Sequence, residues 1–272
     1  MQSILITGCS TGIGHATAYY LKEKGYRVFA TARTYEDVEK LKKDGFEAFV
    51  LDVRDHKNIT EVLKNITNLT GGTLDILFNN AGFGQPGAVE DITTNILKEQ
   101  FETNVFGLHE MMYQVLPIMK SQGSGKIINH SSVLGIISLR LRGAYNASKY
   151  AVEGLSDTLR LELKDTNTPI SVTVLNTGPI KSEFRNNAKA KTIENIDIEN
   201  SRFCDVYKKS LSSAKSDVPF SLEPIDVAKI VESIILTKDV KPRYYITKAT
   251  YILGLAKRIL STTLLDKILI KI

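Results

Sequence analysis

The chain is poor in cysteine and carries neither a long apolar run nor a block of charge of one sign. Its 272 residues include only Cys9 and Cys204, which cannot build a disulfide framework and favour a reducing compartment. The start lacks the charged and apolar regions of a signal peptide, so we expect a cytoplasmic protein. No stretch approaches the ~20 apolar residues of a membrane span, which argues against a membrane-spanning protein.

Charge and histidine content also exclude two classes of partner. The 35 basic residues are interleaved with 30 acidic ones, and the formal net charge is +5. Because the sequence has no Lys/Arg block and no known nucleic-acid-binding signature, we predict no nucleic-acid partner. His15 and His130 have no metal-ligand partners at recognisable spacing, so we predict structural roles for both and no metal site.

Short apolar runs alternate with longer segments of helical periodicity along most of the chain. The runs are almost continuously apolar, as in strands whose two faces are both covered by helices. We therefore predict an α/β fold with a doubly wound parallel sheet, helices on both faces and right-handed crossovers. The expected strands are 3–7, 26–31, 46–51, 74–79, 126–130, 170–176 and 243–247, and the expected helices are 13–24, 35–43, 57–69, 94–120, 143–163 and 224–236.

No linker interrupts this alternation, so we expect one catalytic domain over residues 1–248. The segment 181–220 is polar, rich in Asn and Lys and weakly periodic, and it is too long for a simple connection. We predict that it forms a loop with one or two small helices and acts as a substrate lid.

The C-terminal segment 249–272 is predicted to be an amphipathic helical extension. An apolar stripe lies on one side of a helical wheel and two basic residues lie opposite, and the run 261–263 divides two short helices. These helices could pack on the domain, seal the substrate cleft, pair with another subunit or lie on a membrane. We favour packing or cleft closure. The stripe comprises Tyr251, Ile252, Leu255 and Ile259, and the basic residues are Lys257 and Arg258.

Three glycines crowd the stretch "TGCSTGIG", residues 7–14, between the first expected strand and helix. Glycine permits positive φ and close backbone approach, so the stretch is either a tight turn or a cradle for phosphate. Its place at the start of a helix favours the pyrophosphate of a dinucleotide. Within it, we predict that Cys9 is a small residue near the cofactor rather than a redox nucleophile.

Residues after the next strands indicate which nucleotide would bind. In "VFATARTYED" the basic Arg33 comes before any acid, which favours NADP(H) over NAD(H), although an ordinary surface arginine is the alternative. Asp52 ends the third strand, where it is placed to meet an adenine amino group. The run "NNAG", residues 79–82, ends the fourth strand at the sheet edge where ligands bind.

Four polar residues follow at places suited to catalysis. In "YNASK", Tyr145 and Lys149 are four residues apart and share one face of a helix, a spacing that is also common on helix surfaces. Ser132 lies at the end of the fifth strand, and Asn104 lies inside an expected helix, where asparagine is disfavoured. Together they predict one site at the carboxyl edge of the sheet.

This combination resembles the short-chain dehydrogenase/reductase family. "TGCSTGIG" matches the family's TGxxxGxG, "NNAG" its NNAG, and the four polar residues its Asn-Ser-Tyr-Lys tetrad, in order. The glycine spacing differs from the TGxxGxxG of extended members. The branch that it resembles contains 17β-hydroxysteroid dehydrogenases, retinol dehydrogenases and acyl-dihydroxyacetone-phosphate reductases. In "NTGPIKSEF" the family's proline is replaced by Thr177, and we expect Pro179 to supply the rigidity.

The resemblance implies a Rossmann-type NADPH-dependent oxidoreductase that moves a hydride between nicotinamide and the carbonyl or alcohol of a lipophilic substrate. Tyr145 would exchange the proton, Ser132 would polarise the oxygen, Lys149 would hold the ribose and lower the tyrosine pKa, and Asn104 would anchor a water. The implied cofactor contacts are Gly8, Ser10, Thr11, Gly12, Ile13, Gly14, Arg33, Asp52, Val53, Asn80, Ala81, Gly82, Tyr145, Lys149, Gly178, Ile180 and Ser182.

Two alternatives of other classes stay open. A nucleotide-sensing regulatory protein on the same fold would keep the glycine loop but usually lose the tyrosine or the lysine, and both are present here. A protein that binds a membrane or a partner through its C-terminal helices is the other alternative, in which a membrane-surface contact is allowed but not favoured. By resemblance alone, we also expect a homodimer or homotetramer built on 94–120 and 143–163.

Overall fold

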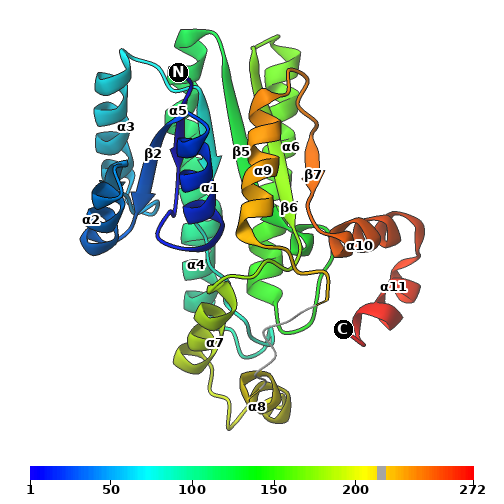
Figure 1. Cartoon of the computed structure of the whole chain (residues 1–272). Coiled ribbons are helices and arrows are strands. Elements are labelled where there is room, and N and C mark those ends of the chain that lie inside the picture. Colours follow the sequence, from blue (N-terminus) through cyan, green and yellow to red (C-terminus); the bar gives the residue numbers. More distant parts are fainter. Residues whose placement is uncertain (213–218) are drawn as a thin grey trace.

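A seven-stranded parallel sheet organises the fold, in the order β3-β2-β1-β4-β5-β6-β7 (Figure 1). The computed structural model describes residues 1–212 and 219–272. The strand order reverses between β1 and β4, and doubly wound sheets bind their ligands outside such a reversal. The strands are β1 (Ser3–Ile6), β2 (Arg27–Ala32), β3 (Glu47–Val50), β4 (Ile76–Asn79), β5 (Gly125–Ser132), β6 (Ile170–Thr177) and β7 (Arg243–Tyr245).

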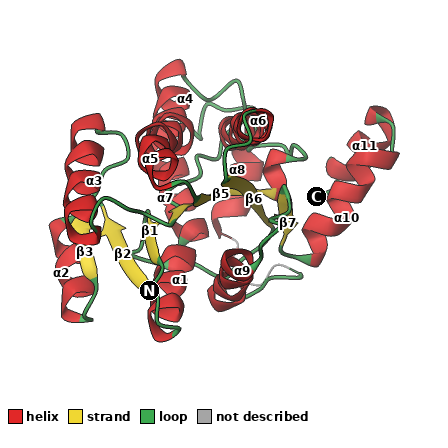
Figure 2. Ribbon diagram, turned by 90° about the horizontal axis from the view of Figure 1, so that it is seen from above, coloured by secondary structure: helices red, strands yellow, loops and turns green. Residues whose placement is uncertain are grey.

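Helices cover both faces of the sheet, as predicted (Figure 2). Within β1, Ile4 and Ile6 face one hydrophobic cluster and Leu5 faces the other, which explains why the strand is apolar throughout. One layer contains α1 (Gly12–Glu23), α2 (Tyr35–Lys43) and α9 (Pro224–Leu236), and the other contains α3 (His56–Thr70), α4 (Thr94–Phe101), α5 (Leu108–Gln122) and α6 (Gly143–Asp165).

The expected single helix over 94–120 is wrong in one respect. A π-helical segment, η1 (Glu102–Gly107), separates α4 from α5. The backbone passes very close to the loop after β3 here, since a Cβ on Gly107 would lie 2.7 Å from Val53 Cγ2. The apolar periodicity does not reveal one widened turn, and such turns are frequent at functional sites.

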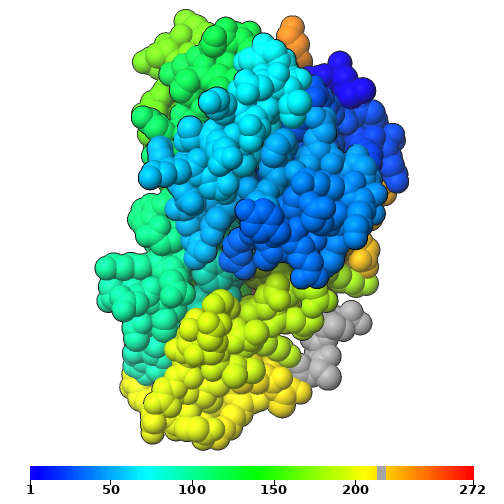
Figure 3. Space-filling view, turned by 90° about the vertical axis from the view of Figure 1, so that its left-hand side faces the viewer, coloured from blue at the N-terminus to red at the C-terminus, as the bar shows by residue number. Residues whose placement is uncertain are grey.

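The segment after β6 forms a lobe beyond the carboxyl edge of the sheet. It contains the two helices α7 (Phe184–Asn195) and α8 (Cys204–Ser212), in agreement with the small helices predicted there. The lobe gathers below the blue N-terminal half in the space-filling view (Figure 3). Buried Tyr207 ties it to the domain, because its hydroxyl donates to Asp91 and accepts from the Ala88 N–H. Residues 213–218 of the predicted lid lie outside the described residues.

The chain ends in two short helices, α10 (Lys248–Ile259) and α11 (Thr262–Leu269). They are divided at Leu260 and Ser261, close to the break expected from the Ser-Thr-Thr run. Both stand beside β7, apart from the two helical layers (Figure 2). Within the described part of the chain, no helix has the length and apolarity needed to cross a bilayer.

Candidate active site

The glycine loop has the backbone geometry that its sequence requires. Gly8 and Gly12 have φ of +74° and +63°, which residues with a Cβ rarely adopt. A Cβ on Gly14 would lie 2.1 Å from the Gly8 carbonyl oxygen, so this position accepts only glycine without a shift of the loop. The Thr11 side chain does not cap α1, which leaves the first-turn N–H groups of the helix without a side-chain acceptor. These features fit a pyrophosphate at the start of α1.

The run after β4 is fastened to this loop by hydrogen bonds. Asn80 donates from Nδ2 to the carbonyl oxygens of Thr7 and Gly8, each at 3.0 Å. The Thr7 hydroxyl accepts from the backbone N–H of Asn80 and of Ala81, each at 2.9 Å. Asn80 therefore orients the glycine loop, in addition to any contact that it makes with a cofactor.

The nucleotide end of the site combines an exposed arginine with a paired aspartate. Arg33 follows β2 and is exposed, and no described carboxylate lies within ion-pair distance of it. Asp52 instead receives a bidentate contact from Arg54, with Nη2 at 2.6 Å from Oδ2. Hydrogen bonds from Arg54 hold the pKa of the Asp52 carboxyl below its usual value. Its predicted contact with adenine stays a prediction.

Asn104 lies in the π-helical segment and is 1% exposed. Its Oδ1 accepts from the Phe83 N–H at 3.1 Å, and its Nδ2 donates to the Phe83 carbonyl at 3.0 Å and the Ser148 hydroxyl at 3.2 Å. The widened turn thus directs this side chain at the loop after β4 and at α6. Asparagine at a disfavoured helical position was the available sequence signal.

Ser132, Tyr145 and Lys149 come together where β5 meets α6. The Lys149 ammonium lies 5.7 Å from the centre of the Tyr145 ring, and Lys149 Nζ donates to the His130 carbonyl oxygen at 2.8 Å. Burial raises the pKa of Tyr145 to about 12, against a lowering by the hydrogen bond to Ser132. Burial lowers the pKa of Lys149 to about 8, against a raising by Glu153. The tyrosine is neutral in this state, so its ionisation needs further positive charge.

A bridge through His130 was not anticipated from the sequence. Its Nδ1 lies 3.2 Å from Asn80 Oδ1 and its Nε2 lies 3.0 Å from Thr177 Oγ1. Because Asn80 offers an oxygen, the neutral ring carries its proton on Nδ1 and accepts from the Thr177 hydroxyl. Burial, followed by the charge of Lys149, lowers the pKa of His130 to about 3. The predicted structural role fits, and the histidine connects β4, β5 and β6.

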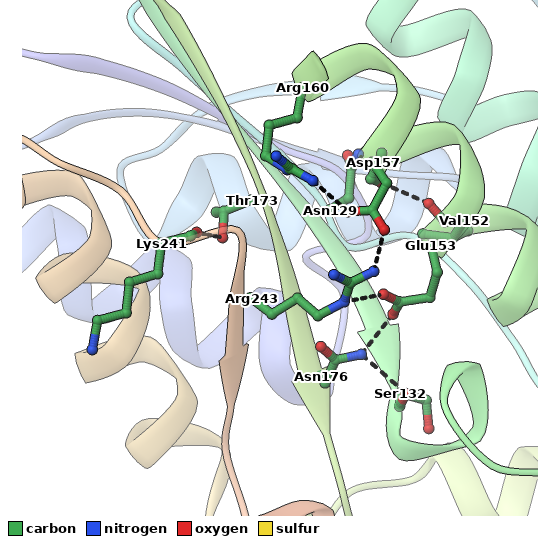
Figure 4. Close-up of polar contacts among 11 residues, drawn as sticks. Asn129, Ser132, Val152, Glu153, Asp157, Arg160, Thr173, Asn176, Lys241 and Arg243 are labelled. Carbon is green, nitrogen blue, oxygen red and sulfur yellow. Dashed lines mark hydrogen bonds and ion pairs between the residues drawn. The ribbon is translucent and has the colours of Figure 1, made fainter. Parts of the chain in front are cut away.

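A buried carboxylate lies one helical turn beyond Lys149. Glu153 Oε1 accepts from Asn176 Nδ2 at 2.6 Å, and that amide also donates to the Ser132 carbonyl at 3.3 Å (Figure 4). Glu153 Oε2 accepts from Arg243 Nε at 2.9 Å, and Arg243 also pairs with Asp157. Hydrophobic periodicity gives no signal for these contacts, since they join residues 23 and 90 positions apart in the chain.

The segment after β6 closes toward the glycine loop. A Cβ on Gly12 would lie 3.4 Å from Ser182 Cβ, and a Cβ on Gly178 would lie 2.0 Å from Thr247 Oγ1. Leu222 fixes the segment, because its N–H donates to the Pro179 carbonyl and its carbonyl accepts from the Lys181 N–H. Backbone pairing therefore holds this segment, and the rigidity expected from Pro179 stays a prediction.

Cys9 lacks the environment of a redox nucleophile, and its predicted place near the cofactor stays a prediction. Its thiol is buried and donates to the Ile6 carbonyl oxygen at 3.3 Å. Burial raises the pKa of this thiol to about 12, so a nucleophilic thiolate does not form near neutral pH. No cluster of metal-ligating side chains occurs among residues 1–212 and 219–272.

Comparison with known proteins gives this arrangement a family. Residues 2–193 match the short chain dehydrogenase family model. The chain belongs to the short-chain dehydrogenase/reductase family. It is therefore an oxidoreductase with a nicotinamide-binding fold, as the sequence motifs predicted.

Relatives of this short-chain dehydrogenase match most of its length. An uncharacterized oxidoreductase, YbbO of Escherichia coli, is 36% identical over 98% of the chain and 94% of its own length. A 3-ketodihydrosphingosine reductase of Bacteroides thetaiotaomicron is 33% identical over 88% and 85%. An NADPH-dependent 1-acyldihydroxyacetone phosphate reductase of Schizosaccharomyces pombe is 31% identical over 79% and 72%, which confirms the predicted branch.

Solved structures agree with the fold. A serine dehydrogenase in complex with NADP⁺ has a TM-score of 0.77 and 26% identity to this dehydrogenase, over 92% of this chain and 96% of that one. Its bound nucleotide supports a nicotinamide cofactor for proteins of this architecture.

Proposed function

We propose that this dehydrogenase reduces the carbonyl group of a lipophilic substrate with NADPH and, in reverse, oxidises the alcohol. The observation that carries the proposal is the meeting of Asn104, Ser132, Tyr145 and Lys149 at the sheet edge that also holds the glycine loop. Bound nicotinamide would supply or accept the hydride. The α1 N-terminus, the Asn80–Gly82 run and the 178–182 segment would hold the dinucleotide, and Arg33 would meet a 2′-phosphate.

Each catalytic side chain would have a distinct task. Tyr145 would donate its phenolic proton to the substrate oxygen, and the nearby Ser132 hydroxyl would hydrogen-bond to the same oxygen. Lys149 would lower the tyrosine pKa through its charge and bind ribose, while its Nζ is held by the His130 carbonyl. Asn104 would anchor a water between Lys149 and solvent. The alcohol oxidation would use the same groups in reverse.

Apolar surroundings support a lipophilic substrate. Tyr145 contacts a hydrophobic cluster that includes Val133 and Leu134, directly after Ser132. The Phe184 ring of the lobe lies 5.6 Å from the Tyr145 ring. Two of the relatives described above are named for ketone substrates with sphingoid or acyl chains.

We also propose a homo-oligomer in a reducing compartment. Phe106, Tyr113 and Leu161 are all more than half exposed on η1, α5 and α6, a surface that a second copy could cover. Cys9 and Cys204 are free thiols, as a reducing compartment such as the cytoplasm would maintain.

One experiment tests the proposed activity. NADPH and NADH oxidation would be followed with a panel of simple carbonyls, steroid and retinoid ketones or aldehydes, and long-chain acyl ketones. We expect turnover with NADPH to exceed turnover with NADH and to rise with substrate chain length. No turnover above that of the Tyr145→Phe variant with any substrate would contradict the proposal.

A further inference from the structure

The C-terminal hairpin, residues 248–272, has an inner and an outer apolar face. Leu265 and Leu269 of α11 are buried against Val133 and Leu134, and Leu253, Ala256 and Leu260 join the same cluster. This inner face explains how the hairpin is held beside β7. It also brings the hairpin next to the segment that follows Ser132.

The apolar stripe of α10 forms the outer face, and the packing that we favoured for these helices uses the inner face. Tyr251, Ile252 and Leu255 are 58–59% exposed and Ile259 is 70% exposed. The small Gly254 lets α10 approach the Tyr245 ring, on which Tyr251 also packs, with 5.5 Å between the two ring centres. On α11, Leu264 and Ile268 are exposed in the same way, at 47% and 41%.

This concentration of exposed apolar side chains is unusual within the molecule. Of the 22 large apolar side chains that are exposed among the described residues, eight lie in the last 22 positions. So many exposed apolar side chains in one short segment indicate an interaction site, because soluble monomers rarely expose large apolar patches.

The positive charge of the C-terminal hairpin indicates the chemistry of its partner. The hairpin carries five basic residues and one acidic residue, Asp266. Lys267 and Lys271 lie beside Leu264 and Ile268 on a helical wheel, an arrangement in which the aliphatic stems can lie along an apolar phase and the ammonium groups stay in water. Two copies paired through this face would bring like charges together, whereas an anionic lipid surface would neutralise them. The basic residues are Lys248, Lys257, Arg258, Lys267 and Lys271.

We propose that the outer face of the C-terminal hairpin docks on the surface of an anionic lipid membrane. The helices lie in the interface and bury Tyr251, Leu255 and Ile259 among the lipid headgroups, without crossing the bilayer. Because the inner face contacts the segment after Ser132, docking places one side of the candidate active site beside the lipid. Only this last consequence rests on the proposed function; the docking itself does not.

Cosedimentation of the full chain with vesicles tests the docking. Phosphatidylcholine vesicles with and without phosphatidylglycerol would be compared for the wild type and for Leu255→Glu/Ile259→Glu. We expect roughly tenfold stronger binding to the anionic vesicles and a loss of about tenfold or more in the double variant. The matched control is Leu69→Glu/Leu236→Glu, with side chains 50% and 69% exposed on α3 and α9, which should bind like the wild type.

Further measurements separate the other outcomes. Lys267→Gln/Lys271→Gln should weaken binding to anionic vesicles and leave weak binding to neutral ones unchanged, which tests the charge even if the glutamate variant fails to fold. Wild-type binding no stronger than that of the hairpin variants would overturn the proposal. So would a lower oligomeric mass of Leu255→Glu/Ile259→Glu in light scattering with no change in vesicle binding, which would make the face a subunit interface.

Discussion

The carboxyl edge of the sheet and the C-terminal hairpin use opposite physical means to present their key residues. At the edge, Asn104 and Lys149 are at most 5% exposed and each has a hydrogen-bond partner within 3.0 Å. On the hairpin, Leu255 and Ile259 are more than half exposed. The first region depends on precise polar contacts and the second on apolar area, so the two should respond to different substitutions.

At the carboxyl edge of the sheet, we expect the largest effect on cofactor affinity from adding a side chain to the glycine loop. Gly14→Ala would place a methyl group 2.1 Å from the Gly8 carbonyl oxygen and 2.5 Å from Asn80 Nδ2. We expect NADPH affinity to fall by about a hundredfold or more in fluorescence titration, since the loop must shift. Gly154→Ala on α6 is the control, because its Cβ meets nothing within 4 Å. Unchanged affinity in Gly14→Ala would argue against pyrophosphate at this loop.

The buried carboxylate should couple stability to the pH dependence of turnover. Glu153→Gln removes the charge that opposes the lowering of the Lys149 pKa and leaves Arg243 with Asp157 alone. We expect the free energy of unfolding to fall by about 2 kcal/mol and the alkaline limit of carbonyl reduction to move to lower pH.

Asp157→Asn is the matched control for that effect. It also removes a partner of Arg243, but Asp157 pairs with Arg160 and Arg243 rather than acting on Lys149, so stability should fall while the alkaline limit stays. A pH–rate profile that moves equally in both variants would mean that Glu153 acts only through folding.

Exposed Arg33 should contribute to the affinity for NADPH and not to the affinity for NADH. We expect Arg33→Ala to lower the affinity for NADPH by about tenfold and to leave the affinity for NADH almost unchanged, because the guanidinium would pair with the 2′-phosphate that only NADPH carries. Separate titrations with the two nucleotides measure this. An equal loss for both would contradict the assignment.

Buried His130 should make the stability of the fold depend on pH. The His130 pKa of about 3 is below that of an unfolded histidine, so the unfolded state binds more protons between pH 6.5 and 3. Stability is therefore present above pH 6.5 and falls as pH decreases, by up to about 1.4 kcal/mol per pH unit from this group. In urea unfolding, the free energy of unfolding of His130→Gln should decrease less steeply as the pH is lowered. The exposed His109→Gln control should keep the wild-type dependence. An unchanged slope in His130→Gln would show that other groups control it.

Much of the carboxyl edge was predictable because its residues belong to local motifs. The alternation of apolar runs with helical segments predicted the sheet and both helical layers. The positions of Ser132, Tyr145 and Lys149 after strand ends predicted that they meet. The widened turn at Asn104 was not predictable, since one extra residue per turn leaves no clear mark on periodicity. Glu153, Asn176 and Arg243 are distant in the chain, and nothing local indicates their contacts.

The C-terminal hairpin shows a different limit to what can be predicted from sequence. Periodicity correctly predicted two short amphipathic helices, with the break near Ser261. It could not tell which face packs, because both sides of α10 carry apolar residues and the cluster that the inner face joins contains Val133 and Leu134, which are far away in the chain. The packing that we favoured for these helices is present, through Leu253, Ala256 and Leu260, whereas the exposure of the stripe was not predictable.

Transfer of deuterium tests the central claim most directly. NADPH deuterated at the transferred position of its nicotinamide ring would be incubated with a lipophilic ketone and the wild type, Tyr145→Phe or Tyr150→Phe. Tyr150, whose hydroxyl donates to the Ile136 carbonyl, controls for loss of a phenol on the same helix. We predict deuterium on the carbinol carbon at similar rates for the wild type and Tyr150→Phe, and at least about a hundredfold slower for Tyr145→Phe. Equal rates in all three proteins, or a product without deuterium, would contradict the account.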